Sequence, residues 1–514
     1  MEKILVLDFG GQYNQLIARR VRDHHVYAEI LPYTTPIETI KENGYKGIIF
    51  TGGPNSVFDM SSPHYTKDIL ELGVPVLGIC YGCQLIAWMG DGKVETAPVS
   101  EYGKIEVTVG ESKLFKDIPE KSVTWMSHTD YIAEPPKGYE IIAHTDNCPC
   151  AAMQNTEKNI YAVQFHPEVT HSEYGKEILH NFLYEVCRCS GDWVMDNFIE
   201  NTVKSLREKI GDKNVILGLS GGVDSSVAAG LLSRAVGKQL TCVFVDQGLM
   251  RKDEGDFVEE TFTRLFDMNF VRVNCGDHFM QCLKGVTDPE QKRKIIGTEF
   301  YKVFWDEVRA RASEGYFAQG TIYPDRIESG KGKSDGKANT AVIKTHHNMV
   351  EKPKDINFID TIEPLGDLFK DEVRAVGEKL GIPHELVWRQ PFPGPGLGVR
   401  IIGEVTADKV KILQDADWVL RDEMSKNGYE SNLAQFFCVL PGVNSVGVMG
   451  DHRTYDNVVV IRAVTTDDFM TADWAKIPYD ILAKVSNRIT NECAHINRVV
   501  YDITSKPPGT VEWE

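Results

Sequence analysis

The chain has 514 residues, of which 42% are hydrophobic and 25% are charged, as in an ordinary soluble protein. Its formal net charge of −18 argues against a general binder of nucleic acids or membrane surfaces. No run approaches the ~20 apolar residues of a membrane span, and the N-terminus lacks the apolar region of a signal peptide. Because the eleven cysteines are scattered, we expect reduced thiols and a cytoplasmic protein.

Three segments that join a strand to a glycine turn open the chain. They begin at residue 4 and at residues 47 and 74, and the third ends in a predicted helix. Strands that alternate with helices predict a doubly wound α/β sheet.

Residues 78–82, GICYG, have the form of a nucleophile elbow with sulfur in place of oxygen. The flanking glycines permit a sharp turn, and a helix N-terminus favours the thiolate that attacks. Cys80 is therefore a candidate nucleophile. A buried cysteine at a tight turn is one alternative, and a thioredoxin-like redox pair with Cys83 is another.

A predicted strand at residues 161–165 is followed by His166 and Glu168. A thiol nucleophile needs a base, and the base needs an orienting acid. These two side chains can supply both at one sheet edge. A structural histidine is the alternative, but the cysteine elbow favours the catalytic interpretation.

The motifs FTGGPNS, GICYGCQ and QFHPE make residues 1–190 resemble a class I glutamine amidotransferase domain. This resemblance implies that Cys80, His166 and Glu168 hydrolyse glutamine through a thioester and release ammonia. It also implies an oxyanion hole and a glutamine site, formed by Gly53, Tyr81, Gln84, Ser127 and His128. Cys83 stands where the family usually has an apolar residue, which suggests sensitivity to oxidation. Metal binding at the Cys148/Cys150 or Cys187/Cys189 pair is a minor alternative, because both lack zinc-knuckle spacing.

A buried strand, a glycine loop and a helix follow one another from residue 215, after a helix at 199–210. Free amide groups and the helix dipole favour a phosphate there, and Asp224 predicts a magnesium ion beside it. A plain turn is the alternative for a bare glycine pair. The motif SGGVDSS resembles the pyrophosphate loop of the ATP pyrophosphatase family, which implies ATP with Mg²⁺ as substrate and no prosthetic group. The residues concerned are Ser220, Gly221, Gly222, Val223, Asp224, Ser225 and Ser226.

Further candidate nucleotide contacts lie between residues 240 and 390. Asp246 ends a predicted strand and could contact ribose or cap the next turn. Residues 317–329 are predicted to form a strand with a loop. The glycine- and lysine-rich segment 330–348 suggests a lid that brings Lys344 and the His346–His347 pair to the site, where polar contacts are favoured over a metal.

A helix is predicted within residues 365–383. Lys370 lies in its first turn, against the helix dipole, which suggests a phosphate partner. A surface lysine is the alternative.

From residue 391 a proline-glycine loop excludes regular helix or strand, and an α+β domain follows. The segments PFPGPGLGVRI, GDHRTYD and KPPGTVEWE resemble the C-terminal domain of the GMP synthetase family, and we expect the terminal peptide to be tied down. The resemblance implies a homodimer formed by this domain, and xanthosine 5′-monophosphate (XMP) as substrate. The implied XMP contacts are Asp451, Arg453, Lys506, Val511 and Glu512.

We therefore predict two doubly wound parallel-sheet domains, at 1–190 and 195–390, followed by a smaller α+β dimerisation domain at 391–514. The implied reaction is the amination of XMP to GMP by ammonia from glutamine, with ATP cleaved to AMP and pyrophosphate. Adenylation turns the C2 oxygen of XMP into a good leaving group. A related amidotransferase such as NAD synthetase is the enzymatic alternative, and a catalytically inactive binding protein is the alternative outside enzymes.

Overall fold

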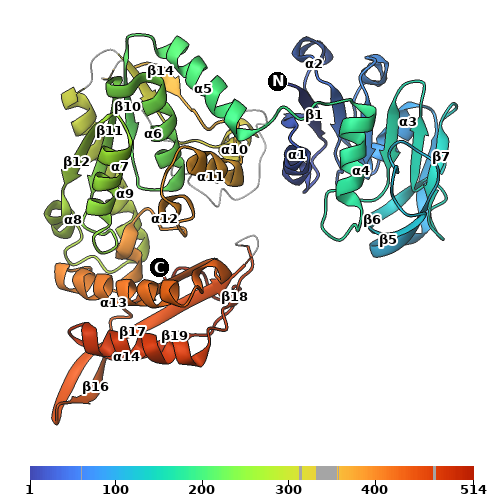
Figure 1. Cartoon of the computed structure of the whole chain (residues 1–514). Coiled ribbons are helices and arrows are strands. Elements are labelled where there is room, and N and C mark those ends of the chain that lie inside the picture. Colours follow the sequence, from blue (N-terminus) through green and yellow to red (C-terminus); the bar gives the residue numbers. More distant parts are fainter. Residues whose placement is uncertain (60, 312–314, 332–355, 357, 467–469) are drawn as a thin grey trace. The chain divides into compact units, whose positions relative to one another are not determined.

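The computed structural model describes residues 1–514 except 60, 312–314, 332–355, 357 and 467–469 (Figure 1). The described chain divides into two compact units, Met1–Phe198 and Ile199–Glu514. Among the described residues, no helix is long and apolar enough to cross a membrane.

The first unit is built on a nine-stranded sheet in the order β2-β1-β3-β4-β9-β8-β7-β5-β6. The first five of these strands are parallel, as predicted. Strands of a parallel sheet are covered on both faces, which explains their short, continuous apolar runs. They are β1 (Lys3–Asp8), β2 (Tyr27–Pro32), β3 (Gly47–Phe50), β4 (Val76–Ile79) and β9 (Ile160–Val163).

The other strands of this sheet are antiparallel, which the sequence analysis did not predict. Buried and exposed residues alternate along much of β5 and β6, as expected for strands with one solvated face, so they lack the continuous apolar run of the parallel strands. These strands are β5 (Lys93–Val109), β6 (Lys121–Glu134), β7 (Glu140–His144) and β8 (Ala152–Asn155). The helices of the unit are α1 (Asn14–Asp23), α2 (Ile37–Asn43), α3 (Tyr81–Met89) and α4 (Gly175–Asn181).

The second unit begins with a five-stranded parallel sheet in the order β12-β11-β10-β13-β14. The chain adds β11 and β12 on one side of β10 and then returns to add β13 and β14 on the other. The carboxyl end of β10 is therefore a topological switch point, where open α/β sheets bind ligands. The strands are β10 (Asn214–Gly218), β11 (Leu240–Asp246), β12 (Asn269–Asn274), β13 (Gly315–Ala318) and β14 (Phe358–Ile362).

Helices accompany this sheet, and one of them corrects the prediction of a strand with a loop at 317–329. The strand ends at Ala318, and α10 begins at Tyr323, where Pro324 is compatible with a first helical turn and Asp325 accepts a hydrogen bond from the Ile322 N–H at 3.2 Å. The helices are α5 (Met195–Ile210), α6 (Val223–Val236), α7 (Glu254–Leu265), α8 (Gly276–Cys282), α9 (Pro289–Arg311), α10 (Tyr323–Lys331), α11 (Lys370–Lys379) and α12 (His384–Val387).

The last part of the chain forms an α+β layer around the central strand β17, which pairs with four others. Part of the proline-glycine loop that precedes it forms a 3₁₀ helix, η4 (Gly396–Arg400). The strands are β15 (Gln435–Val439), β16 (Asn444–Met449), β17 (His452–Thr465), β18 (Asp473–Trp474) and β19 (Ile496–Asp502), and the helices are α13 (Ala407–Lys426) and α14 (Tyr479–Glu492).

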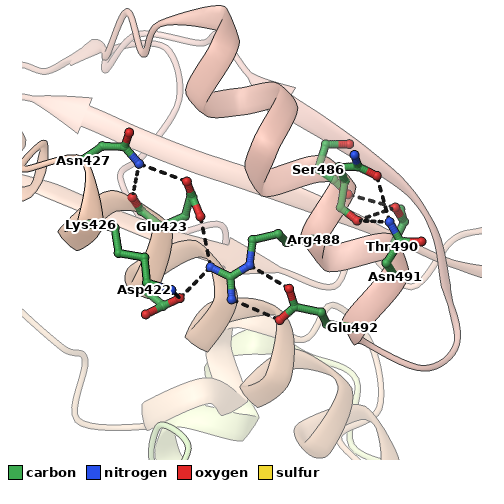
Figure 2. Close-up of polar contacts among 10 residues, drawn as sticks. Asp422, Glu423, Lys426, Asn427, Ser486, Arg488, Thr490, Asn491 and Glu492 are labelled. Carbon is green, nitrogen blue, oxygen red and sulfur yellow. Dashed lines mark hydrogen bonds and ion pairs between the residues drawn. The ribbon is translucent and has the colours of Figure 1, made fainter.

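An arginine joins the two helices of this layer. Arg488 on α14 contacts Asp422 at 2.5 Å and Glu423 at 3.0 Å on α13, and Glu492 on its own helix at 2.7 Å (Figure 2). The layer shares one apolar core with the parallel-sheet part, since Leu249 and Ile296 belong to the same buried cluster as Leu413. The break that we predict at residue 390 therefore does not interrupt the core.

Candidate active sites

The elbow predicted at Cys80 is present between β4 and α3. Cys80 has φ 54° and ψ −107°, a strained conformation for a residue other than glycine. A Cβ at Gly82 would lie 2.6 Å from the Phe50 carbonyl oxygen, and a Cβ at Gly78 would lie 2.7 Å from the Gly82 carbonyl oxygen. The turn therefore requires both flanking glycines.

His166 and Glu168 lie beside the thiol because β4 and β9 are neighbouring parallel strands. The His166 Nδ1 is 2.7 Å from Glu168 Oε1, and both residues are almost fully buried. Burial alone lowers the pKa of His166, but hydrogen bonds with Cys80 and Glu168, and their charges, raise it to about 11. His166 is therefore an imidazolium at neutral pH, beside the cysteine that is the candidate nucleophile.

The positions predicted for the oxyanion hole lie close to the thiol. Tyr81 is the first residue of α3, where a backbone N–H has no acceptor within the helix. A Cβ at Gly53 would lie 3.0 Å from the Phe9 carbonyl oxygen and 3.1 Å from the Tyr81 ring, so the site is fitted to glycine. The oxyanion role itself stays a prediction.

The residues predicted for the glutamine site fix strand β6 next to the Cys80 thiol. The Ser127 carbonyl oxygen lies 3.7 Å from the cysteine sulfur. The Gln84 side chain donates to the Asp130 carbonyl oxygen at 2.7 Å. His128 contacts that same oxygen at 3.0 Å and the Glu101 carboxylate at 3.2 Å. Two of the three predicted side chains therefore position β6, and Ser127 offers its backbone.

Cys83 is not linked to Cys80 by a disulfide in the structure. Both are free thiols, and Cys83 is fully buried. Burial raises the pKa of Cys83 well above its ordinary value, which disfavours the reactive thiolate, and its sensitivity to oxidation stays a prediction.

The loop SGGVDSS joins β10 to α6 as predicted. Gly221 has φ 73°, and its serine neighbours bond to the loop itself. The Ser226 hydroxyl donates to the Gly222 carbonyl oxygen at 2.7 Å and the Ser225 hydroxyl does so at 3.1 Å, while Ser220 Oγ accepts from the Gly222 N–H at 3.3 Å. The hydroxyls therefore stabilise the loop at the α6 N-terminus, and phosphate binding by this loop stays a prediction.

Lys370, at the start of α11, reaches this loop. Its Nζ lies 2.5 Å from Asp224 Oδ2, across 146 residues of sequence. Asp224 Oδ1 is buried and has no hydrogen-bond partner among the described residues. One carboxylate oxygen thus remains for a cation, which fits the predicted Mg²⁺.

Asp246 caps the turn after β11, which was the predicted alternative to ribose binding. Its Oδ1 accepts from the Gly248 N–H at 3.0 Å, and its Oδ2 pairs with Arg272 at 2.7 Å. Contact with ribose stays a prediction. Lys344, His346 and His347, with most of the predicted lid, lie outside the described residues.

The terminal peptide is tied down, as expected. Arg400 makes a bidentate contact with Glu512 at 2.8 and 3.1 Å, and Gln435 donates to the same carboxylate at 2.9 Å. The buried Lys292 pairs with Glu514 at 2.5 Å. Lys506 bonds through its backbone to Ala472 on the strand-like segment before β18.

Comparison with known proteins adds three family models and full-length relatives. The models are "Glutamine amidotransferase class-I" at residues 5–186, "NAD synthase" at 195–291 and "GMP synthase C terminal domain" at 422–513. A glutamine-hydrolysing GMP synthase of Ruminiclostridium cellulolyticum is 59% identical over 514 residues, 100% of this chain and 99% of its own. One from Acetivibrio thermocellus is 60% identical with the same coverage.

The chain belongs to the glutamine-hydrolysing GMP synthase family. It is therefore a ligase, and its amidotransferase and ATP pyrophosphatase domains fit the glutamine-dependent amination of XMP. The NAD synthase model covers residues 195–291, whereas the full-length relatives are GMP synthases, so the comparisons do not support the NAD synthetase alternative. The solved structure of a putative GMP synthase subunit from Thermoplasma acidophilum matches 36% of the chain and 94% of its own at 32% identity, with a TM-score of 0.33.

Sequence reasoning missed several side chains that support the sites of this GMP synthase family member. Arg389 donates to the Gly221 carbonyl oxygen at 2.8 Å and pairs with Glu254, which links the phosphate loop to α7. Arg400 and Gln435 hold the tail, as described above. Their partners are far away in the sequence, so no local pattern marks them.

The predicted XMP contacts lie at two places. Lys506, Val511 and Glu512 belong to the tail, whereas Asp451 and Arg453 lie at the tip of the β16–β17 hairpin. Gln435, which contacts Glu512, is paired with Val464 near the other end of β17. At ~3.2 Å per residue, the eleven steps from Arg453 to Val464 span roughly 35 Å.

Proposed function

We propose that this chain converts XMP to GMP with two chemical centres, a glutaminase centre at Cys80 and an ATP-using centre at the SGGVDSS loop. The observation that carries the proposal is the buried pair of His166 and Glu168 next to the cysteine elbow, in a chain that also holds the loop. This combination links ammonia release to activation of an acceptor by ATP.

The glutaminase half follows from the charge state of the triad. The Cys80 thiolate attacks the side-chain amide of glutamine, and the backbone N–H groups of Gly53 and Tyr81 stabilise the oxyanion. His166 gives its proton to the departing ammonia, and Glu168 stabilises the imidazolium that exists before this transfer. Water then hydrolyses the thioester to glutamate.

The synthetase half uses the amides of the loop to bind the pyrophosphate part of ATP. Asp224 would hold Mg²⁺ through its free oxygen, and Lys370 lies close enough to balance phosphate charge. The XMP C2 oxygen attacks the α-phosphorus of ATP, and pyrophosphate leaves. Ammonia then displaces AMP from C2 and yields GMP.

We propose further that two copies of the chain complete the XMP site. Because Asp451 and Arg453 lie roughly 35 Å from the tail along β17, they would reach XMP only as residues contributed by the second copy. The hairpin that carries them extends beyond α14 (Figure 1) and exposes Val446 at 46%, Val448 at 75% and Tyr455 at 69%. Such a patch is typical of an interface.

The interface proposal is tested by replacing Val446 and Val448 with lysine and measuring the molar mass in solution. We expect monomers with a raised KM for XMP, while glutaminase activity is retained. A variant that stays dimeric with an unchanged KM for XMP would refute it.

We also propose a cytoplasmic location, because all eleven cysteines are free, as is expected in a reducing compartment.

The function is tested by incubating the chain with ATP, Mg²⁺, glutamine and XMP, and by measuring GMP, AMP and pyrophosphate. Cys80→Ala should abolish GMP formation from glutamine and retain formation from ammonium salts. Loss of both activities would contradict the division of labour, and failure of the native chain to make GMP would refute the proposal.

A further inference from the structure

Three metal-ligating side chains meet on the surface of the second unit, away from the residues assigned above. His278 and Cys282 lie one turn apart on α8, and Glu299 lies on α9. The His278 Nε2 is 3.0 Å from Glu299 Oε2 and 3.7 Å from Cys282 Sγ. All three ligand atoms lie within 4.8 Å of one another.

We propose that His278, Cys282 and Glu299 form a zinc site. Around a tetrahedral zinc ion with bonds of about 2.0–2.3 Å, neighbouring ligand atoms lie roughly 3.3–3.6 Å apart. The two distances from the imidazole nitrogen bracket this spacing, so small side-chain movements would admit the ion. Three protein ligands leave the fourth position to water.

The surroundings of Glu299 leave one oxygen for the metal. Lys302 pairs with Oε1 at 2.5 Å, while Oε2 faces the histidine. The His278 side chain is 47% exposed, which gives a hydrated ion access to the ligands.

A second Cys/His/Glu group in the first unit does not share these properties. Glu101, His128 and Cys148 also lie close together, but all three are buried. The Thr145 hydroxyl donates to Glu101 at 2.6 Å, and His128 bonds to both the carboxylate and a backbone oxygen. These groups already satisfy one another, so the group positions β6 and does not recruit an ion.

The proposed metal would connect α8 to α9. Phe279 on α8 and Ile296 on α9 belong to the core that unites the second unit, and Lys292 on α9 holds the terminal Glu514. Zinc would therefore stabilise the surface that supports the tail, and it would supply no step of the reaction.

The test uses zinc titration of the full chain against a chromogenic chelator. Because Cys80, His166 and Glu168 are also a possible ligand set, the titration is made in a Cys80→Ala background. We expect one high-affinity site, which His278→Ala or Cys282→Ser should weaken by more than the roughly 10–100-fold that loss of an outer partner produces.

The matched control is His495→Ala, which removes an exposed histidine that lies 3.8 Å from Asp456 and belongs to neither Cys/His/Glu group. It should leave zinc affinity unchanged. Cobalt binding should give a thiolate-to-metal absorption band that Cys282→Ser abolishes, and zinc should raise the melting temperature of the parent but not of that variant. Equal zinc affinity in all these variants, or a missing cobalt–thiolate band, would overturn the proposal.

Discussion

Replacing Glu168 with glutamine should shift the pH dependence of glutamine hydrolysis. The carboxylate lies 2.7 Å from His166 Nδ1 in a site that water hardly reaches, since His166 is 5% and Glu168 1% exposed. Loss of an opposite charge at this distance should lower the His166 pKa by about 1–3 units. His166 is active while protonated, and its raised pKa keeps that form from acid pH up to about 11 in the native chain.

The alkaline limb of the kcat/KM profile should therefore move to lower pH in the variant. In addition, kcat should fall by roughly 10²–10⁴-fold, because the imidazolium is less populated and less well oriented. The assay is glutamate release from pH 6 to 10, with ammonium-dependent GMP formation as an internal control. Glu101→Gln is a matched control, because Glu101 faces His128 at 3.2 Å and should not move the alkaline limb. An alkaline limb unchanged in Glu168→Gln would refute the proposed thiolate–imidazolium pair.

Three further changes test separate parts of the molecule. Asp224→Asn should reduce XMP-dependent pyrophosphate release roughly 100-fold or more, because the charged oxygen that would hold Mg²⁺ is lost, and leave glutaminase activity intact; undiminished release would exclude the metal role. Gly53→Ala would place a Cβ 3.0 Å from the Phe9 carbonyl oxygen and should lower glutaminase kcat by about 10–100-fold, whereas Gly110→Ala, with its nearest atom at 3.6 Å, should not; equal rates would argue against the oxyanion hole. Arg488→Ala removes three ion pairs and should lower the free energy of unfolding in urea by about 1–2 kcal/mol. The control Lys426→Ala, which removes one pair, should lower it by under ~0.5 kcal/mol. A loss for Arg488→Ala no larger than that of the control would mean that the network in Figure 2 is solvated.

Local sequence patterns were informative wherever a short stretch carries both the fold and the chemistry. The elbow at Cys80 and the SGGVDSS loop each combine a buried strand, glycines and a helix start, so their structure follows from neighbouring residues. The position of His166 beside Cys80 also followed, because parallel strands place their carboxyl ends at one sheet edge. The strands β5 and β6 were missed because their half-exposed pattern carries a weaker signal than a continuous apolar run.

The sequence by itself predicted the two chemical centres and, through resemblance, the family that the relatives confirm. Only the tertiary structure decided which charges meet. Lys370 could face solvent or a phosphate by its sequence, and it contacts Asp224; Asp246 could bind ribose, and it caps a turn and pairs with Arg272. Arg400 and Glu512, 112 residues apart, meet at the tail. Such pairings depend on how distant elements pack, because electrostatic partners are chosen by distance in space and leave no periodic trace along the chain.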